Sequence, residues 1–476
     1  MGLNELTLFE LREKLEKRDI LTEDIVRDIK SAVDRDEKSD EPLNAYISFD
    51  MERIGKDREG AGDRQKGLLK GVPVAVKDLI NVYGTKTTCG SRILKDYTAP
   101  YDAAAVVNMR MNGGVPAGKT NMDEFAMGSS NETSFYGSVK NPHNRKKIPG
   151  GSSGGAASAV AAHLAVAALG TDTGGSIRQP ASMCGTFGIK PTYGRVSRYG
   201  LVAYASSFDQ IGPITKSVMD GALLLEAVSG YDPKDSTSAK ESVPCFSDSV
   251  GRGIGGLKVG IPDEYFGEGL DDEVRAIVEK GVSILEEAKA TVKRISLRYT
   301  KYAIASYYII ATAEASSNLA RFDGMRYGTR SVDTADLAVL YRENRSRGFG
   351  KEVKRRILLG TFALSSGYYD AYYLRAQKAR TLIREDFKRA FEEVDIIVTP
   401  VSPIPAWDIG KLIDNPLQMY LSDVYTVPVN LAGLPAASVP CGRTEAGLPV
   451  GIQIIADQFN EGNIFSASRV IEEAVQ

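Results

Sequence analysis

Histidine is scarce in this sequence, whose 476 residues include only His143 and His163. A Ser-His-Asp catalytic triad therefore has little choice of base. His163 lies in an alanine-rich segment typical of a packed helix, and His143 lies in a turn-like Asn-Pro-His-Asn string. Both remain candidates, but a lysine is the better candidate for a base if the chain uses a serine nucleophile.

Cysteine is also sparse, and its pattern excludes two classes of small protein. The four cysteines are far apart and form no C-x-x-C pair. This argues against a disulfide framework and against a zinc knuckle, and it suits a reducing cytosol. The N-terminal residues are charged throughout and contain no apolar export segment. The most apolar stretch, from Ala156 to Leu169, is shorter than the ~20 residues that span a membrane. We therefore expect a cytoplasmic protein without a membrane segment.

An excess of positive charge is missing as well. The chain has 59 basic and 61 acidic residues, which gives a formal net charge of −2. A surface that grips nucleic acid directly is usually strongly basic. The balance therefore indicates an ordinary soluble enzyme and gives no sign of direct nucleic-acid binding.

Two glycine-flanked serine loops are the most distinctive feature that the sequence does contain. One runs from Gly150 to Gly155 and holds Ser152, and the other is Thr173-Gly174-Gly175-Ser176. Neither has the G-x-S-x-G pattern of a nucleophile elbow. Glycine lets backbone N–H groups approach a ligand closely, so the N–H groups of residues 173–176 could form an oxyanion hole beside a serine nucleophile. A flexible linker is the alternative, but these loops flank apolar, core-forming sequence that predicts a helix leading into a buried strand.

Lys77 is the best candidate for the base. It ends the apolar run Gly71-Val72-Pro73-Val74-Ala75-Val76, which predicts a buried strand. Burial lowers the pKa of a lysine and supplies the neutral amine that a base requires. The alternatives are a salt bridge to a neighbour such as Asp78, or a side chain that reaches the solvent at the strand end.

Three strings now identify a resemblance: G-V-P-V-A-V-K-D, P-G-G-S-S-G-G and G-T-D-T-G-G-S-I-R-Q-P-A. Together, and with the same spacing, they resemble the amidase signature family. The resemblance implies a Ser-Ser-Lys triad with Ser176 as nucleophile, Ser152 as bridging serine and Lys77 as ultimate base. It also implies a cis peptide bond at Gly151–Ser152, with the Ser152 hydroxyl in hydrogen-bond reach of Lys77 and Ser176.

Longer strings at residues 121–130, 354–361, 365–373 and 427–435 resemble the tRNA-dependent amidotransferase branch of that family. This implies a glutaminase that releases ammonia for partners, subunits B and C of a heterotrimer. Those partners would amidate Glu-tRNA(Gln), Asp-tRNA(Asn) or both. ATP and Mg²⁺ are then expected on a partner, with no cofactor or metal in this chain. The alternatives are a free-standing hydrolase of small amides and an inactive scaffold. The intact lysine and serines count against the scaffold.

The same resemblance implies how glutamine would be held. Arg356 would bind the α-carboxylate, Asp423 the α-ammonium, and Tyr307 would line the pocket. The neighbours Arg355 and Tyr308 leave each assignment open by one residue, and Asp423 could instead cap a helix. Asp172 and Arg178, which flank the nucleophile, are expected to brace its loop.

Strands and helices alternate along the chain, which predicts an α/β fold with a large mixed sheet covered by helices. Length alone allows about three domains. The resemblance instead implies one domain over 1–476. Within it we expect an N-terminal helical layer at 1–40, a catalytic core at 66–230, a surface excursion at 231–256 and the remainder, with the substrate pocket, at 257–476.

Local patterns give several further expectations. Residues 5–38 predict two amphipathic helices, and residues 44–49 a strand followed by a charged helix and a polar loop up to Lys66. The tyrosine-rich stretch 358–379 predicts a helix buried on several sides. Residues 113–120 spell a Walker A motif and 251–256 spell G-x-G-x-x-G, but neither lies between a strand and a following helix, so we expect no nucleotide site at either.

Overall fold

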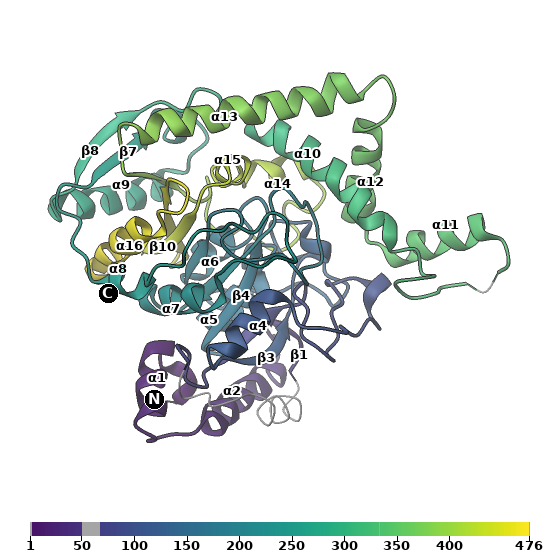
Figure 1. Cartoon of the computed structure of the whole chain (residues 1–476), viewed down its shortest axis with the longest axis horizontal. Coiled ribbons are helices and arrows are strands. Elements are labelled where there is room, and N and C mark those ends of the chain that lie inside the picture. Colours follow the sequence, from purple (N-terminus) through teal and green to yellow (C-terminus); the bar gives the residue numbers. More distant parts are fainter. Residues whose placement is uncertain (1, 50–66, 333, 476) are drawn as a thin grey trace.

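One mixed β-sheet forms the centre of the computed structural model, which describes residues 2–49, 67–332 and 334–475 (Figure 1). The strand order is β1-β3-β2-β4-β6-β5-β10-β11-β9-β7-β8. Parallel pairs join β2 to β3 and β4, and join β7 to β8 and β9. The other neighbours are antiparallel. This arrangement confirms the predicted α/β fold with a mixed sheet.

Strands β2, β4 and β6, which are adjacent in the sheet, are buried along their whole length. The strands of the described residues are β1 Tyr46–Ser48, β2 Pro73–Lys77, β3 Val115–Thr120, β4 Ala167–Asp172, β5 Phe187–Lys190, β6 Gln210–Thr215, β7 Lys258–Pro262, β8 Thr291–Ile295, β9 Ile396–Pro400, β10 Ala436–Arg443 and β11 Pro449–Ala456.

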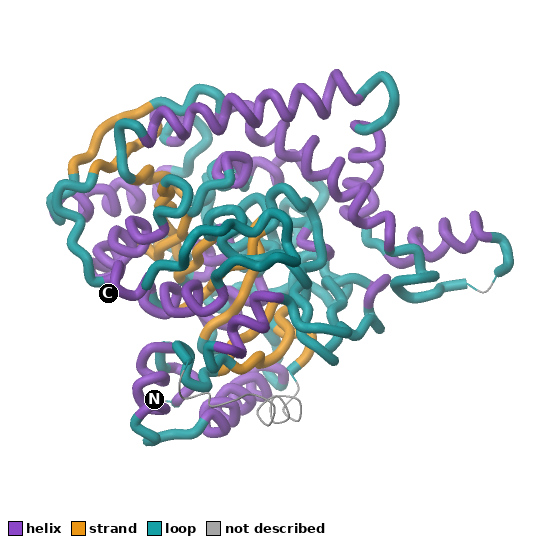
Figure 2. The backbone as a smooth tube through the Cα atoms, viewed as in Figure 1, coloured by secondary structure: helices purple, strands orange, loops and turns teal. Residues whose placement is uncertain are grey.

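Helices surround these strands, as Figure 2 shows. The α-helices of the described residues are α1 Leu8–Glu16, α2 Thr22–Glu37, α4 Ala104–Met111, α5 Gly154–Ala161, α6 Arg178–Cys184, α7 Val218–Val228, α8 Phe246–Val250, α9 Asp272–Glu287, α10 Ala303–Asn318, α11 Leu337–Gly348, α12 Lys351–Ala363, α13 Arg375–Phe391, α14 Pro416–Leu421, α15 Val427–Ala432 and α16 Glu461–Val475. No helix in these described ranges is long and apolar enough to cross a membrane.

The two N-terminal helices form a layer that is anchored on the core by a buried carboxylate. The N–H groups of Leu8 and Phe9, at the start of α1, donate to Asp220 of α7 at 3.0 Å each. A carboxylate at a helix N-terminus satisfies N–H groups that have no partner within the helix. The predicted helix pair and the strand at 44–49 are confirmed, while the charged helix expected up to Lys66 lies outside the described residues.

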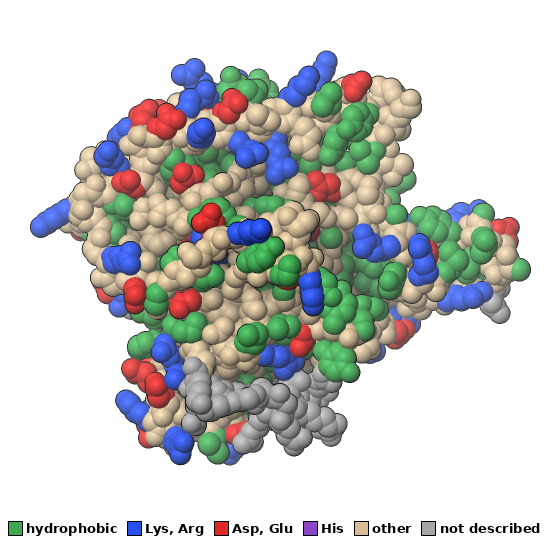
Figure 3. Space-filling view, in the orientation of Figure 1, with side chains coloured by type: hydrophobic (Ala, Val, Ile, Leu, Met, Phe, Trp, Pro, Cys, Tyr) green, Lys and Arg blue, Asp and Glu red, His purple; other side chains and the backbone are tan. Residues whose placement is uncertain are grey.

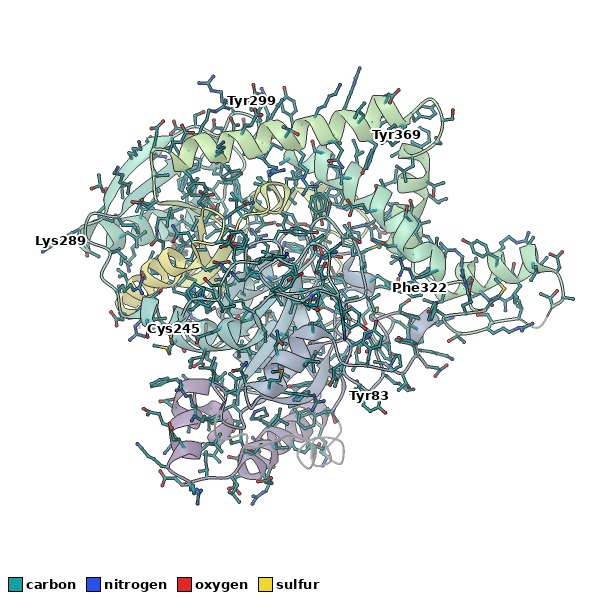
Figure 4. The ribbon with its side chains drawn as sticks, in the orientation of Figure 1. Tyr83, Cys245, Lys289, Tyr299, Phe322 and Tyr369 are labelled. Atoms are coloured by element: carbon teal, nitrogen blue, oxygen red, sulfur yellow. The ribbon has the colours of Figure 1, made fainter. Side chains whose placement is uncertain are left out.

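The tyrosine-rich stretch differs from its prediction. It is not a helix buried on several sides: α12 ends at Ala363, and a π-helical turn, Tyr369–Leu374, leads into α13. Tyr368, Tyr369 and Tyr372 are 42–44% exposed at this corner, where Figure 4 labels Tyr369 and Figure 3 shows apolar side chains on the surface. The rings pack mainly on one another, because the two long helices diverge here and no other element of the described residues covers the outside.

The expected surface excursion at 231–256 is only partly correct. Its second half contains α8, whose Phe246 is fully buried and packs on Phe465 of α16 with ring centroids 5.5 Å apart. Residues 240–244 remain largely exposed. A short amphipathic helix within a serine- and aspartate-rich segment is easily missed, because the composition of the whole segment hides two apolar side chains.

Both matches to nucleotide-binding motifs are chance matches of sequence, because neither has the structural context of such a site. The Walker A string leads from a turn into β3, and its Lys119 is buried in an ion pair with Asp78 at 3.2 Å. Such a lysine cannot reach a phosphate. A Cβ added to Gly251, Gly253 or Gly255 would have no atom within 4 Å, and these glycines precede β7, which fits the predicted surface loop.

Helices α10 and α12 pack unusually closely at one glycine. A Cβ on Gly360 would lie 1.9 Å from the carbonyl oxygen of Thr312, so only glycine permits this approach. Because α10 carries Tyr307 and α12 carries Arg356, this contact sets the spacing between two predicted pocket residues.

Replacing Gly360 by alanine is therefore expected to lower the stability of the fold. Overpacking a close contact costs ~1–3 kcal/mol, which exceeds the ~1 kcal/mol that alanine gains as a better helix former. Thermal unfolding of Gly360→Ala should show a lower midpoint. Gly253→Ala, whose Cβ meets nothing, is the matched control and should leave the midpoint unchanged. An equal or higher midpoint for Gly360→Ala would contradict the packing described here.

Candidate active site

Lys77 ends the central strand β2 and is completely buried. Its Nζ atom lies 2.8 Å from Ser152 Oγ, 2.9 Å from Ser153 Oγ and 2.8 Å from Thr171 Oγ1. Burial lowers the pKa of this amine to about 7, against the opposing charges of Asp123, Asp172 and Asp209. The salt bridge considered between Lys77 and Asp78 is not formed, because Asp78 pairs with Lys119.

The three hydroxyls around Lys77 have different roles. The Ser153 hydroxyl donates to the Thr171 carbonyl at 3.0 Å, so it can only accept a hydrogen bond from Lys77. A neutral lysine amine has two N–H groups and one lone pair. If one N–H donates to Ser153 and the other to Thr171 Oγ1, the lone pair is left for the hydroxyl of Ser152. Ser153 and Thr171 thus orient the amine of Lys77, the candidate base. The sequence alone gave them no role, although Ser153 is adjacent to the predicted bridging serine.

The peptide bond between Gly151 and Ser152 is cis, as the resemblance implied. The Oγ atom of Ser152, the residue after this bond, is hydrogen-bonded to Lys77 Nζ. A Cβ on Gly151 would lie 2.1 Å from Asp123 Oδ2 and 2.7 Å from the Ser130 nitrogen. Glycine is therefore required at 151 because Asp123 and the chain around Ser130 pack directly on its Cα.

Ser176 lies in the short loop between β4 and α6; Figure 1 labels both of these elements. Its carbonyl oxygen accepts from the N–H of Ser153 at 3.1 Å, which joins the two serine loops. Its side chain is 7% exposed, and its hydroxyl has no hydrogen-bond partner among the described residues. The expected bond to Ser152 is thus not formed in this structure. Catalytic hydrogen bonds often shorten only when substrate is bound.

The predicted oxyanion hole needs one correction. The N–H of Gly175 donates to Asp172 Oδ1 at 2.8 Å, so it does not face a substrate. Gly175 has φ +135°, and a Cβ there would lie 2.3 Å from Thr426 Oγ1. The N–H groups of Thr173, Gly174 and Ser176 have no acceptor in the described part of the chain. They remain the candidate donors to an oxyanion.

A buried ion pair holds the nucleophile loop. Arg178 binds both oxygens of Asp172 at 3.0 Å, and both side chains are fully buried. Although burial alone would raise the pKa of Asp172, the charge of Arg178 holds it well below its usual range. Arg178 also donates to Asn430 and Gln453, so the loop is tied to segments far along the chain. This is the brace that the sequence predicted.

Neither histidine takes part in this site. The His143 ring is hydrogen-bonded to the Cys184 carbonyl at 2.8 Å and contacts Arg443. His163 follows α5 and its carbonyl accepts from Asn4 at 2.9 Å. The lysine is therefore the base candidate next to the serines.

Arg356 presents a free edge of its guanidinium. Its Nε donates to Glu352 at 2.8 Å and its Nη1 donates to the Tyr204 hydroxyl at 2.7 Å, while Nη2 has no acceptor among the residues that the structure describes. The neighbouring Arg355 is bound to the other oxygen of Glu352. An arginine fixed in this way can bind a carboxylate with its open edge.

Asp423 lies close to this arginine and is 7% exposed. One carboxylate oxygen accepts from Ser129 Oγ at 2.6 Å and the other from Gln179 Nε2 at 3.1 Å. Burial raises the pKa of Asp423 to about 7. A cation bound beside it would favour its ionised form.

The neighbouring residues Tyr307 and Tyr308 contact different parts of the site. The Tyr307 hydroxyl lies over Gly174, 2.6 Å from where a Cβ would be, so Tyr307 covers the nucleophile loop. Tyr308 stacks on Tyr420 with centroids 3.8 Å apart, and both rings face the Arg356 guanidinium. Tyr308 therefore supports the arginine, and the sequence could not separate the two roles.

A cavity of about 230 Å³ opens at this end of the site, and Ser129, Ser130, Arg356 and Tyr420 are among its lining residues. The described residues contain no group of three or more His, Cys, Asp or Glu side chains that could hold a metal ion. The site thus offers a serine hydroxyl, a buried lysine, unpaired N–H groups and a charged pocket.

Known proteins match this chain over nearly its whole length. The family model described as Amidase matches residues 27–465. The chain belongs to the amidase family. The A subunit of glutamyl-tRNA(Gln) amidotransferase from Geotalea daltonii is 53% identical over 479 residues, covering 99% of this chain and 98% of the relative.

Solved structures of the amidase family agree with the fold. The crystal structure of the glutamyl-tRNA(Gln) amidotransferase A subunit from Thermotoga maritima is 42% identical, with a TM-score of 0.82, and the match covers 100% of this chain and 96% of that one. The structure of 6-aminohexanoate cyclic dimer hydrolase is 25% identical with a TM-score of 0.85, covering 99% and 97%. Enzymes with different substrates thus share this fold, so the substrate must be argued from the pocket.

Proposed function

We propose that this chain is the glutaminase subunit of a tRNA-dependent amidotransferase. It hydrolyses glutamine through a seryl ester and supplies the ammonia to a partner protein. The high identity to glutamyl-tRNA(Gln) amidotransferase A subunits over the full chain supports this proposal. The near-neutral charge is consistent with tRNA being held by partners, and the four free cysteines fit work in the cytoplasm.

The observation that carries the proposal is the charge pattern of the pocket. The open edge of Arg356 suits an α-carboxylate, and Asp423 suits an α-ammonium. Free glutamine carries both groups, and its carboxamide is the bond to be cleaved. The alternative, a free-standing hydrolase of small apolar amides, does not require an arginine with an open edge and a buried carboxylate in its pocket.

Acylation begins at the lysine. Neutral Lys77 accepts the proton of Ser152 Oγ, which accepts the proton of Ser176 Oγ, and Ser176 Oγ attacks the carboxamide carbon. The resulting oxyanion is held by N–H groups of Thr173, Gly174 and Ser176. Losing one such donor typically costs ~3 kcal/mol in barrier height. The proton then returns through Ser152 to the leaving nitrogen, and ammonia departs.

Deacylation uses the same groups in the second half. Water attacks the glutamyl ester while Lys77, through Ser152, accepts a proton from it. The C–O bond to Ser176 then breaks, and the proton passes back through Ser152 to Ser176 Oγ, which gives glutamate and the free serine. ATP and Mg²⁺ have no role in these steps. In the proposed heterotrimer, whose other members are subunits B and C, they act on a partner that activates the mischarged residue.

The base assignment predicts the effect of changing Lys77. Lys77→Ala should abolish glutamine hydrolysis, and Lys77→Arg should not restore it, because arginine stays protonated. In the unchanged protein the pKa of Lys77 is lowered to about 7, so the amine is neutral above that pH. The kcat for glutamine should therefore rise with pH, about tenfold per unit below 7, and level off above it.

Lys190→Met is the matched control for these measurements. Burial also lowers the pKa of Lys190 to about 7, but its ammonium donates to the Pro191 carbonyl and does not touch the serines. This variant should keep most of the activity and the same pH profile. Near-normal turnover in Lys77→Arg, or a kcat that falls as the pH rises from 6 to 8, would contradict the lysine-base mechanism.

The two serines should respond differently to removal. Ser176→Ala should form no acyl-enzyme, whereas Ser152→Ala should keep a slow residual nucleophile at Ser176. Trapping with an electrophilic glutamine analogue and peptide mass mapping should place the adduct on Ser176. An adduct on Ser152 in the unchanged protein would reverse the two assignments.

Assembly tests the proposed function as a whole. When a tagged form of the chain is expressed in its own organism, it should co-purify with two different subunits. Its glutaminase rate should rise in their presence. Glutamine and an aliphatic amide of similar size are the substrates to compare. A chain that purifies alone and prefers the apolar amide would favour the free-standing amidase.

A further inference from the structure

The side chain of Gln179 forms hydrogen bonds at both ends, with two parts of the site that are distant in sequence. Its Oε1 accepts from the N–H of Gly151 at 3.1 Å. Its Nε2 donates to Asp423 Oδ1 and to Ser422 Oγ, at 3.1 Å each. The side chain is fully buried. The partners fix the orientation of the amide, because an N–H donor needs the carbonyl oxygen and a carboxylate needs the NH₂ group.

The two ends of this amide serve different steps of the reaction. Gly151 immediately precedes Ser152, whose hydroxyl is hydrogen-bonded to Lys77. Asp423 is the proposed partner of the α-ammonium of glutamine. Its second oxygen is already bound by Ser129 at 2.6 Å. A cation that binds Asp423 shares a carboxylate that already accepts from Ser129 and Gln179. Each oxygen can accept a further hydrogen bond, so the cation joins these donors and can shift the carboxylate relative to Gln179.

The amide of Gln179 is planar, so a shift at one end is carried to the other. Readjustment at Asp423 moves Nε2, and Oε1 moves with it against the N–H of Gly151. The backbone at Gly151 has little freedom to move elsewhere, because Asp123 and the chain at Ser130 pack on its Cα. A movement of the Gly151 N–H is therefore expected to shift the next peptide bond, the one between Gly151 and Ser152.

We propose that Gln179 is a positioning residue that couples the occupied ammonium site at Asp423 to the alignment of Ser152. The inference rests on the proposed glutaminase function and deepens it. The α-ammonium of the substrate then contributes to turnover as well as to binding, since its contact is used to align the reacting groups. The site is therefore selective for amides that carry an α-ammonium group, and part of that selectivity lies in kcat.

The test compares two substrates that differ only at this group: glutamine, and glutaramate, which is glutamine without its α-amino group. Steady-state kinetics are measured on the full chain in complex with its co-purified subunits. In the unchanged protein, kcat should be about tenfold or more higher for glutamine, the effect of one charge-assisted hydrogen bond. In Gln179→Met, which keeps the side-chain length, kcat for glutamine should fall until the two substrates are nearly equal.

Ser422→Ala is the matched control, because it removes the other acceptor of Gln179 Nε2 and leaves both ends of the coupling in place. Its kcat ratio between the substrates should equal that of the unchanged protein. A purely structural role for Gln179 would lower kcat for both substrates by the same factor in Gln179→Met. That result, a change confined to KM, or equal kcat values in the unchanged protein would overturn the proposal.

Gln179→Glu keeps the test decisive if the methionine variant does not fold, as judged by its thermal unfolding. Glutamate keeps an acceptor for the N–H of Gly151 but places an oxygen opposite Asp423, so the kcat ratio should again fall. An unchanged ratio in this variant would overturn the coupling. If the unchanged complex hydrolyses neither substrate, the proposed function itself fails; if it hydrolyses glutamine with a ratio independent of Gln179, only the coupling fails.

Discussion

This site depends on the burial of one lysine amine in the core. Lys77 ends a strand that is buried at every residue, between two parallel neighbours. In water its amine would be protonated and useless as a base, whereas the sheet around it lowers its pKa to about 7. The hydroxyls of Ser152, Ser153 and Thr171 satisfy its hydrogen bonds without adding charge. The core of the fold thus lowers the pKa of the amine that we propose as the base.

Buried charged groups hold in place both the loop that contacts this amine through Ser152 and Ser153 and the neighbouring loop of Ser176. Asp172 uses its carboxylate to bind Arg178 and the N–H groups of Gly175 and Ile177, on either side of the nucleophile. Asp123 packs on Gly151 and accepts from the N–H of Asn131. Carboxylates buried in this way are stable only when fully hydrogen-bonded, so each one fixes the loop around it. The loops are consequently parts of the core and not flexible connections.

Several features could be predicted because their signals are local. Glycines beside Ser152 and Ser176 marked the two loops, and an apolar run ending in Lys77 marked a buried lysine. The alternation of strands and helices predicted the fold class. Local predictions were wrong where the composition of a segment did not reflect its burial. The tyrosines at 368–372 look like core residues by hydrophobicity, yet they lie at an uncovered corner. The short helix α8 was hidden in a polar segment for the opposite reason.

By itself, the sequence determined which residue types were available for acyl transfer and which elements would carry them, since these depend on spacing and on neighbours along the chain. Only the tertiary structure decided which groups are free to act. It removed the N–H of Gly175 from the oxyanion hole, separated the roles of Tyr307 and Tyr308, and joined Gln179 to Asp423 across 244 positions. Such contacts depend on the packing of distant segments, so no local pattern records them.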